Sequence, residues 1–306
     1  MRAELGRAVV GQHSMINGLL TGLICEGHIL LEGAPGLAKT LTIRSLSEIT
    51  NFQCQRIQFT PDLLPSDLIG TEMYHPKSGS FETRKGPIFA NLILADEINR
   101  APPKVQSALL EAMQERQVTI GDRSWPLPRP FLVLATQNPI DQEGTYPLPE
   151  AQADRFMLKV TVGYPSKDEE REVLLRGRQP PSKLARVAGA AELELCRSVV
   201  SELYYEPLLL DYIINLVRAT RDPNEYGVDL HRMISYGASL RATMALEQAS
   251  RVEAFFQGRA FVVPDDIKAV APAVLRHRIV LSYESEADGV TTDTIIEQLL
   301  QHIPVP

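Results

Sequence analysis

The stretch HILLEGAPGLAKTLTIRSL, from His28 to Leu46, places a glycine-bearing turn between an apolar run and a helical pattern. The letters HILLE predict a buried strand, and the letters AKTLTIRSLSEIT predict a helix. Backbone N–H groups are unpaired at the start of a helix, and the helix dipole there favours an anion. The stretch therefore predicts a strand–turn–helix unit with a candidate phosphate site at the turn.

The turn departs at one position from the phosphate-binding pattern G-x-x-x-x-G-K-[ST], because Ala38 stands where the second glycine is usual. We expect Ala38 to open the helix with a negative φ, a conformation in which its methyl group is tolerated. Gly33 and Gly36 would let the backbone turn tightly and approach phosphates. Lys39 would bring a positive charge to the terminal phosphates, and Thr40 would offer a hydroxyl to Mg²⁺. The nucleotide-binding residues predicted here are Gly33, Ala34, Pro35, Gly36, Leu37, Ala38, Lys39, Thr40 and Leu41. The alternative is an ordinary turn before an amphipathic helix.

A second apolar run, in NLILADEINRA, ends in two adjacent carboxylates, Asp96 and Glu97. Unpaired buried charge is costly, so a buried strand that ends this way indicates a functional acid pair. Asp96 would contribute to the Mg²⁺ shell beside Thr40. Glu97 would polarise a water for attack on the γ-phosphate. The alternative is a strand followed by a solvated acidic turn; the phosphate loop upstream favours the acid pair.

A third apolar run, in FLVLATQNP, ends in the polar residues Thr136, Gln137 and Asn138. In a parallel strand beside the acid pair, the Asn138 amide would position the attacking water or contact the γ-phosphate. The alternative is a polar strand-end cap, since Asn-Pro commonly marks a turn.

The pattern of apolar and polar residues changes near Tyr164 and Pro165. Before this point, short apolar runs alternate with helical stretches, as is typical of parallel strands covered on both faces. After it, helical patterns dominate, from SKDEEREVLLRGR to TTDTIIEQLLQHI. We therefore expect an α/β nucleotide-binding core over residues 1–165 and a helical domain over residues 166–306.

Composition sets broad limits on function. The chain has 306 residues, a formal net charge of −7 and a pI of about 5.5, which disfavours a general nucleic-acid coat protein with a basic face. The cysteines Cys25, Cys54 and Cys196 are few and far apart, which indicates a reducing compartment. The first residues lack the apolar core of a signal peptide, and no apolar run approaches the length of a membrane span. We expect a cytoplasmic protein. The motifs begin close to Met1, which leaves a native N-terminal extension open.

Six segments carry a family resemblance: VVGQ (Val9–Gln12), GAPGLAKT (Gly33–Thr40), LADEINRAPPKVQSALLEAMQE (Leu94–Glu115), ATQNP (Ala135–Pro139), EGTYPLPEAQADRF (Glu143–Phe156) and YGASLRAT (Tyr236–Thr243). In content and order they resemble the MoxR family of AAA+ ATPases, in which alanine before the loop lysine is usual. The resemblance implies a parallel five-stranded core followed by a smaller all-helical lid, with Mg²⁺-dependent hydrolysis of ATP to ADP and phosphate. It also implies that Val10, Gly11 and Gln12 lie against the adenine.

The resemblance implies roles for three further residues. Asn138 would be the sensor on the fourth core strand. Arg155 would be the arginine finger that reaches the γ-phosphate of a neighbouring subunit, and Arg241 would be the sensor arginine of the lid. From the residues alone, Arg155 could equally pair with Asp154 or Glu150, and Arg241 could be a solvated helix charge.

Two segments extend a minimal phosphate-loop core. Residues 70–91 predict two extended pieces around a turn, and residues 116–128 predict a second hairpin. They resemble the helix-2 insert and pre-sensor hairpin of the AAA+ branch that contains MoxR proteins, MCM helicases and magnesium chelatase, whose hairpins would point toward the pore of a ring. The first segment contains three basic residues, Lys77, Arg84 and Lys85. We interpret it as a solvated loop rather than a nucleic-acid contact.

Three functional hypotheses follow. The leading one is a MoxR-type ATPase that binds ATP or ADP and forms a hexameric ring. It would remodel or activate a partner protein, and this activity includes insertion of a metal cofactor. By the resemblance, a von Willebrand A domain protein is the expected partner. The alternative is a nucleic-acid-dependent motor, which the hairpins suggest and the acidic charge disfavours. The third is a nucleotide switch with little turnover, against which the Asp96–Glu97 pair argues.

Overall fold

The computed structural model describes residues 1–77, 79–138, 144–178 and 183–306, which form two compact units. The first unit comprises Met1–Leu148 and Val160–Leu193, and the second comprises Pro149–Lys159 and Glu194–Pro306. The domain boundary expected after residue 165 stays a prediction. In the structure, residues 160–193 group with the first unit and residues 149–159 with the second.

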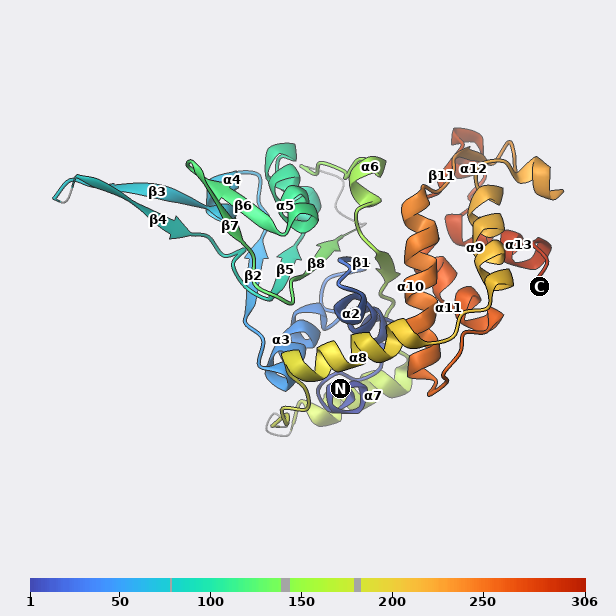
Figure 1. Cartoon of the computed structure of the whole chain (residues 1–306), viewed down its shortest axis with the longest axis horizontal. Coiled ribbons are helices and arrows are strands. Elements are labelled where there is room, and N and C mark those ends of the chain that lie inside the picture. The colour runs from blue at the N-terminus through green and yellow to red at the C-terminus, as the bar shows by residue number, and fades with distance from the viewer. Residues whose placement is uncertain (78, 139–143, 179–182) are drawn as a thin grey trace. The chain divides into compact units, whose positions relative to one another are not determined.

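A five-stranded parallel sheet forms the α/β core, as the family resemblance implies (Figure 1). Its strand order is β2-β5-β8-β1-β9. The strands are β1 Ile29–Glu32, β2 Cys54–Gln58, β5 Leu92–Asp96, β8 Leu132–Gln137 and β9 Leu158–Thr161. Strand β8 therefore lies between β1, which leads into the glycine-bearing turn, and β5, which ends at the acid pair.

The central strands are buried because apolar side chains project from both of their faces. Leu94 on β5 and Leu134 on β8 are fully buried, and the two residues are paired in the register of these strands. Strand β2 is at the edge of the sheet, and Ile57 is its one buried residue. The other side chains of β2 are free to face solvent or a cavity.

Helices of the first unit cover this sheet. Helix α2 contacts β1 and β8, α3 contacts β2 and β5, and α1 packs on α2 and α3. In chain order up to Arg176, the helical elements are α1 Arg2–Ala8, α2 His13–Cys25, α3 Lys39–Thr50, α4 Pro65–Ile69, η1 Ile98–Arg100, α5 Pro103–Glu115, α6 Glu150–Ala153 and α7 Lys167–Arg176.

Both expected hairpins are present in the first unit. Strands β3 Gly70–His75 and β4 Ser80–Lys85 form the longer one, and β6 Gln117–Ile120 and β7 Arg123–Pro126 form the shorter one. The Lys85 ammonium lies 4.5 Å from the centre of the Trp125 ring, which ties the base of the first hairpin to the second. The β3–β4 hairpin then extends outward from the sheet (Figure 1).

The second unit is mainly helical, as expected, and also contains a short antiparallel strand pair. Its helical elements are α8 Ala190–Glu202, which begins in the first unit, α9 Pro207–Ala219, η2 Pro223–Tyr226, α10 Leu240–Phe256, α11 Pro264–Leu275, α12 Tyr283–Ala287 and α13 Thr292–His302. The pair consists of β10 Ile234–Tyr236 and β11 Val280–Leu281. Strands this short give no readable alternation in a sequence, so the pair was not predicted.

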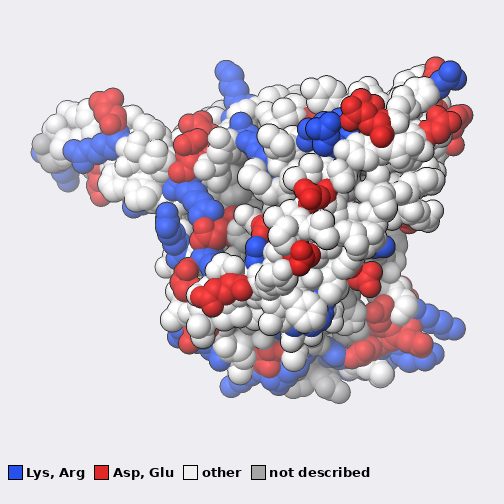
Figure 2. All heavy atoms as spheres, turned by 45° about the vertical axis from the view of Figure 1, so that its right-hand side comes forward, with Lys and Arg blue, Asp and Glu red and all other residues white. Residues whose placement is uncertain are grey.

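Acidic and basic side chains are interspersed on the face shown in Figure 2. This face therefore does not present the continuous basic surface on which nucleic-acid binding depends. Among the residues that the structure describes, no helix combines the length and the apolar character needed to cross a membrane.

Candidate active site

The glycine-bearing turn has a left-handed backbone at two positions. Gly36 has φ 84°, and a Cβ added there would meet no atom within 4 Å, so open space lies beside the backbone. Ala38 has φ 60° and ψ 15°. The expectation of a negative φ at Ala38 was wrong. Helix α3 begins at Lys39, so Ala38 is the last residue of the turn, and it brings the chain round so that its own carbonyl accepts the N–H of Thr42 at 2.9 Å.

The first glycine of the turn serves close packing. A Cβ on Gly33 would come within 2.5 Å of the Val162 carbonyl oxygen, so only glycine fits beside the end of β9. The Gly33 carbonyl accepts a hydrogen bond from the Lys39 Nζ at 2.6 Å, which holds the lysine over the turn. Burial lowers the pKa of Lys39, and the carboxylates of Asp96 and Glu97 oppose that shift.

The acid pair is held from the neighbouring strand β8. The Thr136 hydroxyl donates to Asp96 Oδ1 at 2.7 Å and accepts the Glu97 N–H at 2.9 Å. Glu97 has φ 57° and ψ 51°, a left-handed conformation that is strained for a residue with a side chain. Thr136 thus fixes both the direction of the Asp96 carboxylate and the bend at which Glu97 leaves the strand.

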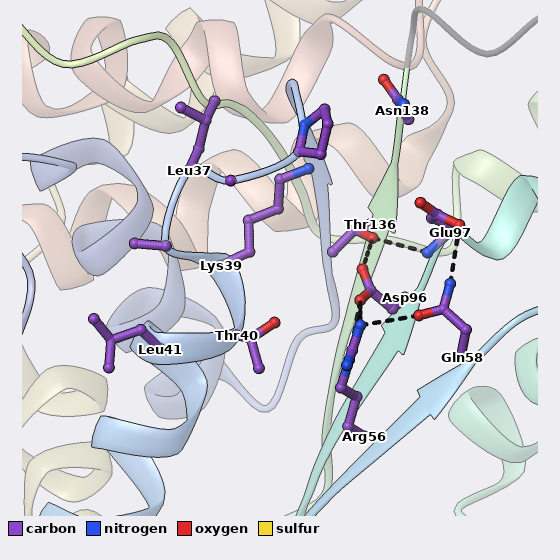
Figure 3. Close-up of a pocket in the computed structure, with 13 residues that line it drawn as sticks. Leu37, Lys39, Thr40, Leu41, Arg56, Gln58, Asp96, Glu97, Thr136 and Asn138 are labelled. Atoms are coloured by element: carbon purple, nitrogen blue, oxygen red, sulfur yellow. Dashed lines mark hydrogen bonds and ion pairs between the residues drawn. The ribbon is translucent and has the colours of Figure 1, made fainter.

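Two side chains of the edge strand β2 join this network (Figure 3). Arg56 places Nη2 at 2.7 Å and Nε at 3.1 Å from Asp96 Oδ2. The same Nη2 donates to Gln58 Oε1 at 3.0 Å, and Gln58 Nε2 donates to Glu97 Oε2 at 2.9 Å. Sequence reasoning missed both residues. Their i, i+2 spacing places both side chains on one face of a strand. Because that strand pairs with the acid-bearing strand, this spacing was the sequence signal for their place in the site.

A cavity of about 380 Å³ brings these groups together. It is lined by Pro35, Gly36, Leu37, Ala38, Lys39, Thr40, Leu41, Arg56, Gln58, Asp96, Glu97, Thr136 and Asn138. Most of the predicted loop residues, both acids and the predicted sensor Asn138 therefore share one site. Gly33 and Ala34 belong to the same turn but are not part of this lining.

The predicted adenine-binding stretch is not among the described residues that line the cavity. Gln12 caps helix α2 with φ 52°, and its Nε2 donates to the Gly163 carbonyl at 3.1 Å. A Cβ on Gly11 would meet a Glu169 carboxylate oxygen at 2.5 Å. The role of Val10, Gly11 and Gln12 against adenine stays a prediction.

The two predicted arginines lie in the second unit. Arg155 is half-buried in the turn between α6 and β9, and Arg241 is the second residue of α10. The Arg241 Nη1 lies 3.4 Å from Asp154 Oδ2, a contact that the solvated-charge alternative did not include. Asp154 also accepts hydrogen bonds from Ser239 and Arg278.

The donor set of the cavity fits a Mg²⁺–nucleotide complex. Mg²⁺ prefers oxygen ligands and is usually held by one or two protein groups together with substrate phosphates and waters. The Thr40 hydroxyl and the Asp96 carboxylate supply such oxygens on one cavity. Asp96 retains acceptor capacity beyond its contacts with Arg56 and Thr136, because a carboxylate has about four lone-pair sites. The turn supplies free backbone N–H groups and the Lys39 ammonium to phosphates.

Fold and cavity together define a phosphate-loop nucleotide hydrolase: a parallel sheet with a glycine-bearing turn after one strand and two carboxylates at the end of another. A family model described as the ATPase family associated with various cellular activities matches residues 28–158. A model of the AAA lid domain matches residues 229–299.

Individual relatives agree with these models over nearly the whole chain. Chaperone MoxR1 of Mycobacterium tuberculosis is 46% identical over 304 residues, which cover 99% of this chain and 81% of that protein. The YeaC protein of Bacillus subtilis is 41% identical over 305 residues, with 99% and 93% covered. A crystal structure of a candidate ATPase from Cytophaga hutchinsonii superposes with a TM-score of 0.93 at 52% identity, covering 99% of this chain and 93% of that one. The chain belongs to the MoxR family of AAA+ ATPases, and it binds nucleotide and hydrolyses ATP.

Proposed function

We propose that this ATPase hydrolyses Mg²⁺-bound ATP in the cavity of Figure 3 and uses the energy to remodel or activate a partner protein. The observation that carries the proposal is the convergence of the phosphate turn, the Thr40 hydroxyl and the Asp96–Glu97 pair on one cavity. Mg²⁺, held by Thr40 and Asp96, would neutralise charge on the β- and γ-phosphates.

The side chains of the cavity have separate tasks in this proposal. Lys39 releases the Gly33 carbonyl and donates to the terminal phosphates. Glu97 accepts a proton from the attacking water, and Asn138 orients that water. Gln58 holds Glu97 Oε2, so it fixes which carboxylate oxygen faces the nucleotide. Thr136 holds the Asp96 carboxylate and the Glu97 backbone N–H, so it keeps the metal-binding carboxylate beside the bend from which the base projects.

Replacement of the base tests the proposal. Glu97→Gln keeps the size of the side chain and removes its ability to take a proton. We expect ATP binding to survive, because the phosphate turn is unchanged, and phosphate release to fall by about a hundredfold or more. Glu111→Gln, at an exposed position of α5, is the matched control and should hydrolyse ATP normally. Normal phosphate release by the Glu97 variant would reject the role given to this residue.

The partner and the assembly complete the proposal. MoxR1, a relative at 46% identity, is named a chaperone, which supports action on another protein. We place the ATPase in a hexameric ring in the cytoplasm, where its three free cysteines would stay reduced, and expect a von Willebrand A domain protein as its partner. Glu97→Gln loaded with ATP should retain that partner in a pull-down, and Lys39→Ala should not. Equal recovery by both variants would contradict ATP-dependent binding.

A further inference from the structure

Arg278 is a buried charge whose contacts are concentrated on the turn that carries Arg155. Its side chain is 2% exposed. Nε donates to Asp154 Oδ1 at 2.8 Å, and Nη2 donates to the backbone carbonyls of Asp154 and Phe156 at 3.2 and 2.6 Å. Nη1 donates to the carbonyls of Met157 and Val274. All five guanidinium N–H groups are thereby used, which no other side chain could reproduce.

The two residues before Arg278 hold the same segment. His277 Nε2 donates to the Phe156 carbonyl at 2.9 Å. Burial and the neighbouring Arg278 lower the pKa of His277 well below its ordinary value, so the ring is neutral and Nε2 carries the proton. Arg276 forms two bonds with the Asp293 carboxylate at 3.0 Å each and donates Nη1 to the Lys159 carbonyl at 3.0 Å.

The held segment is also tied to the start of α10. Ser239, the N-cap of that helix, donates its hydroxyl to Asp154 Oδ2 at 2.9 Å, and Arg241 lies 3.4 Å from the same oxygen. All of these residues belong to the second unit. Asp154 and Phe156 are therefore anchored on both sides of Arg155.

We propose that Arg276, His277 and Arg278 are positioning residues for Arg155: they fix the backbone from Asp154 to Lys159 and so set where the Arg155 guanidinium is presented. This inference rests on the proposed role of Arg155 at a neighbouring subunit's nucleotide. The reason for such rigidity is energetic. Burying a charge requires full compensation, and an active-site group displaced by about 1 Å can cost a hundredfold in rate.

The test uses mixed rings with two kinds of subunit. Lys39→Ala subunits cannot hold ATP but donate Arg155, and Arg155→Ala subunits hold ATP but donate no finger. Random mixing in a head-to-tail ring makes roughly a quarter of the interfaces complete, so ATP hydrolysis should return. If labelled subunits exchange and no activity returns, the role of Arg155 in trans is rejected, and the premise of this inference with it.

Arg278→Lys is then added to one kind of subunit at a time. On the Lys39→Ala donor it should lower the restored hydrolysis by at least about tenfold, because the donated finger loses its support. On the Arg155→Ala acceptor it should leave the restored rate unchanged. Equal losses on the donor and the acceptor would overturn the proposal, since a general effect on folding does not depend on which subunit carries the change. A loss on the acceptor alone, or no loss on either, would also overturn it.

Two further variants separate positioning from folding. Arg259→Lys alters another ion pair of the second unit, with Asp266, that does not include the Asp154–Lys159 segment; on the donor it should leave the restored rate unchanged. Arg276→Lys should destabilise the subunit less than Arg278→Lys, because the partner of Arg276, Asp293, is half-exposed. It replaces Arg278→Lys in the test if Arg278→Lys lowers the thermal unfolding temperature of the isolated subunit. It should show the same donor-side loss, and an acceptor-side loss of equal size would again overturn the proposal.

Discussion

Ala38 is the residue at which the phosphate turn departs from the usual pattern, and its left-handed backbone has a measurable consequence. A left-handed alanine costs about 1–2 kcal/mol, whereas glycine takes this conformation freely but gains entropy in the unfolded chain. We expect Ala38→Gly to raise the free energy of unfolding by about 0.5–1 kcal/mol in urea denaturation. Ala269→Gly, at an exposed position inside α11, should lower it by about 1 kcal/mol. Destabilisation by both changes would show that the turn at Ala38 is not strained.

Lys39 is the one loop side chain proposed to meet the terminal phosphates through a full charge. Lys39→Ala removes that charge and the bond to the Gly33 carbonyl, while the backbone cradle stays in place. We expect a large loss of ATP affinity by calorimetry. In the absence of nucleotide, the free energy of unfolding should stay within about 1 kcal/mol of the unmodified chain, because the lysine is only half-buried. Undiminished ATP affinity would contradict the assigned role.

At the level of elements, His28 joins helix α5 to strand β8 just before β1 begins. Its Nδ1 accepts the Val133 N–H at 3.0 Å, and Nε2 donates to the Met113 carbonyl at 3.1 Å. Both bonds require the neutral ring with the proton on Nε2. Burial lowers the pKa of His28 to about 4.

This shift makes the packing of α5 on the sheet sensitive to acid. The unfolded chain binds a proton at His28 near its ordinary pKa of about 6.5, and the folded chain does so only near 4. The contribution of His28 to the free energy of unfolding is therefore complete above the pKa of the unfolded chain. It is lost as the pH falls toward the pKa of the folded chain. The stability difference between the unmodified chain and His28→Gln should shrink by about 2 kcal/mol between pH 7 and pH 4.5 in urea titrations. A pH-independent difference would show that the buried ring does not titrate in this way.

The elements that sequence predicts are those whose physical signal is long or repeated. Buried parallel strands and amphipathic helices of ten or more residues leave clear patterns, so the sheet and the lid helices were found. The three-residue strand β10 and two-residue strand β11 do not. The acids and the phosphate turn were visible because charge and glycine are unusual in those places. Arg56 and Gln58 are ordinary on an exposed edge strand, and only the strand order β2-β5-β8 reveals that they meet the acids.

For the whole molecule, the proposed site residues come from two units of the chain. The phosphate turn and the acids belong to the first unit, and Arg155 and Arg241 to the second. If the two arginines act on nucleotide as proposed, whether of their own subunit or of a neighbour, then bound nucleotide links a first unit to a second unit. Assembly should therefore depend on the nucleotide bound.

A ligand that bridges two subunits favours the assembled state by mass action, and one site per head-to-tail interface closes a ring. We expect Glu97→Gln with ATP to form particles of about six times the 34.0 kDa chain mass in light scattering. Lys39→Ala on its own should remain smaller than Glu97→Gln at the same protein concentration, whatever the ATP concentration, because its interfaces lack the bridging ligand. Arg155→Ala should bind ATP normally yet need a higher protein concentration to assemble, because its guanidinium no longer contacts the neighbour's phosphate. The discriminating comparison is Arg155→Ala with Arg259→Lys, which changes an arginine of the same unit away from that turn. If both assemble at the same protein concentration, the Arg155 contact does not contribute to the interface.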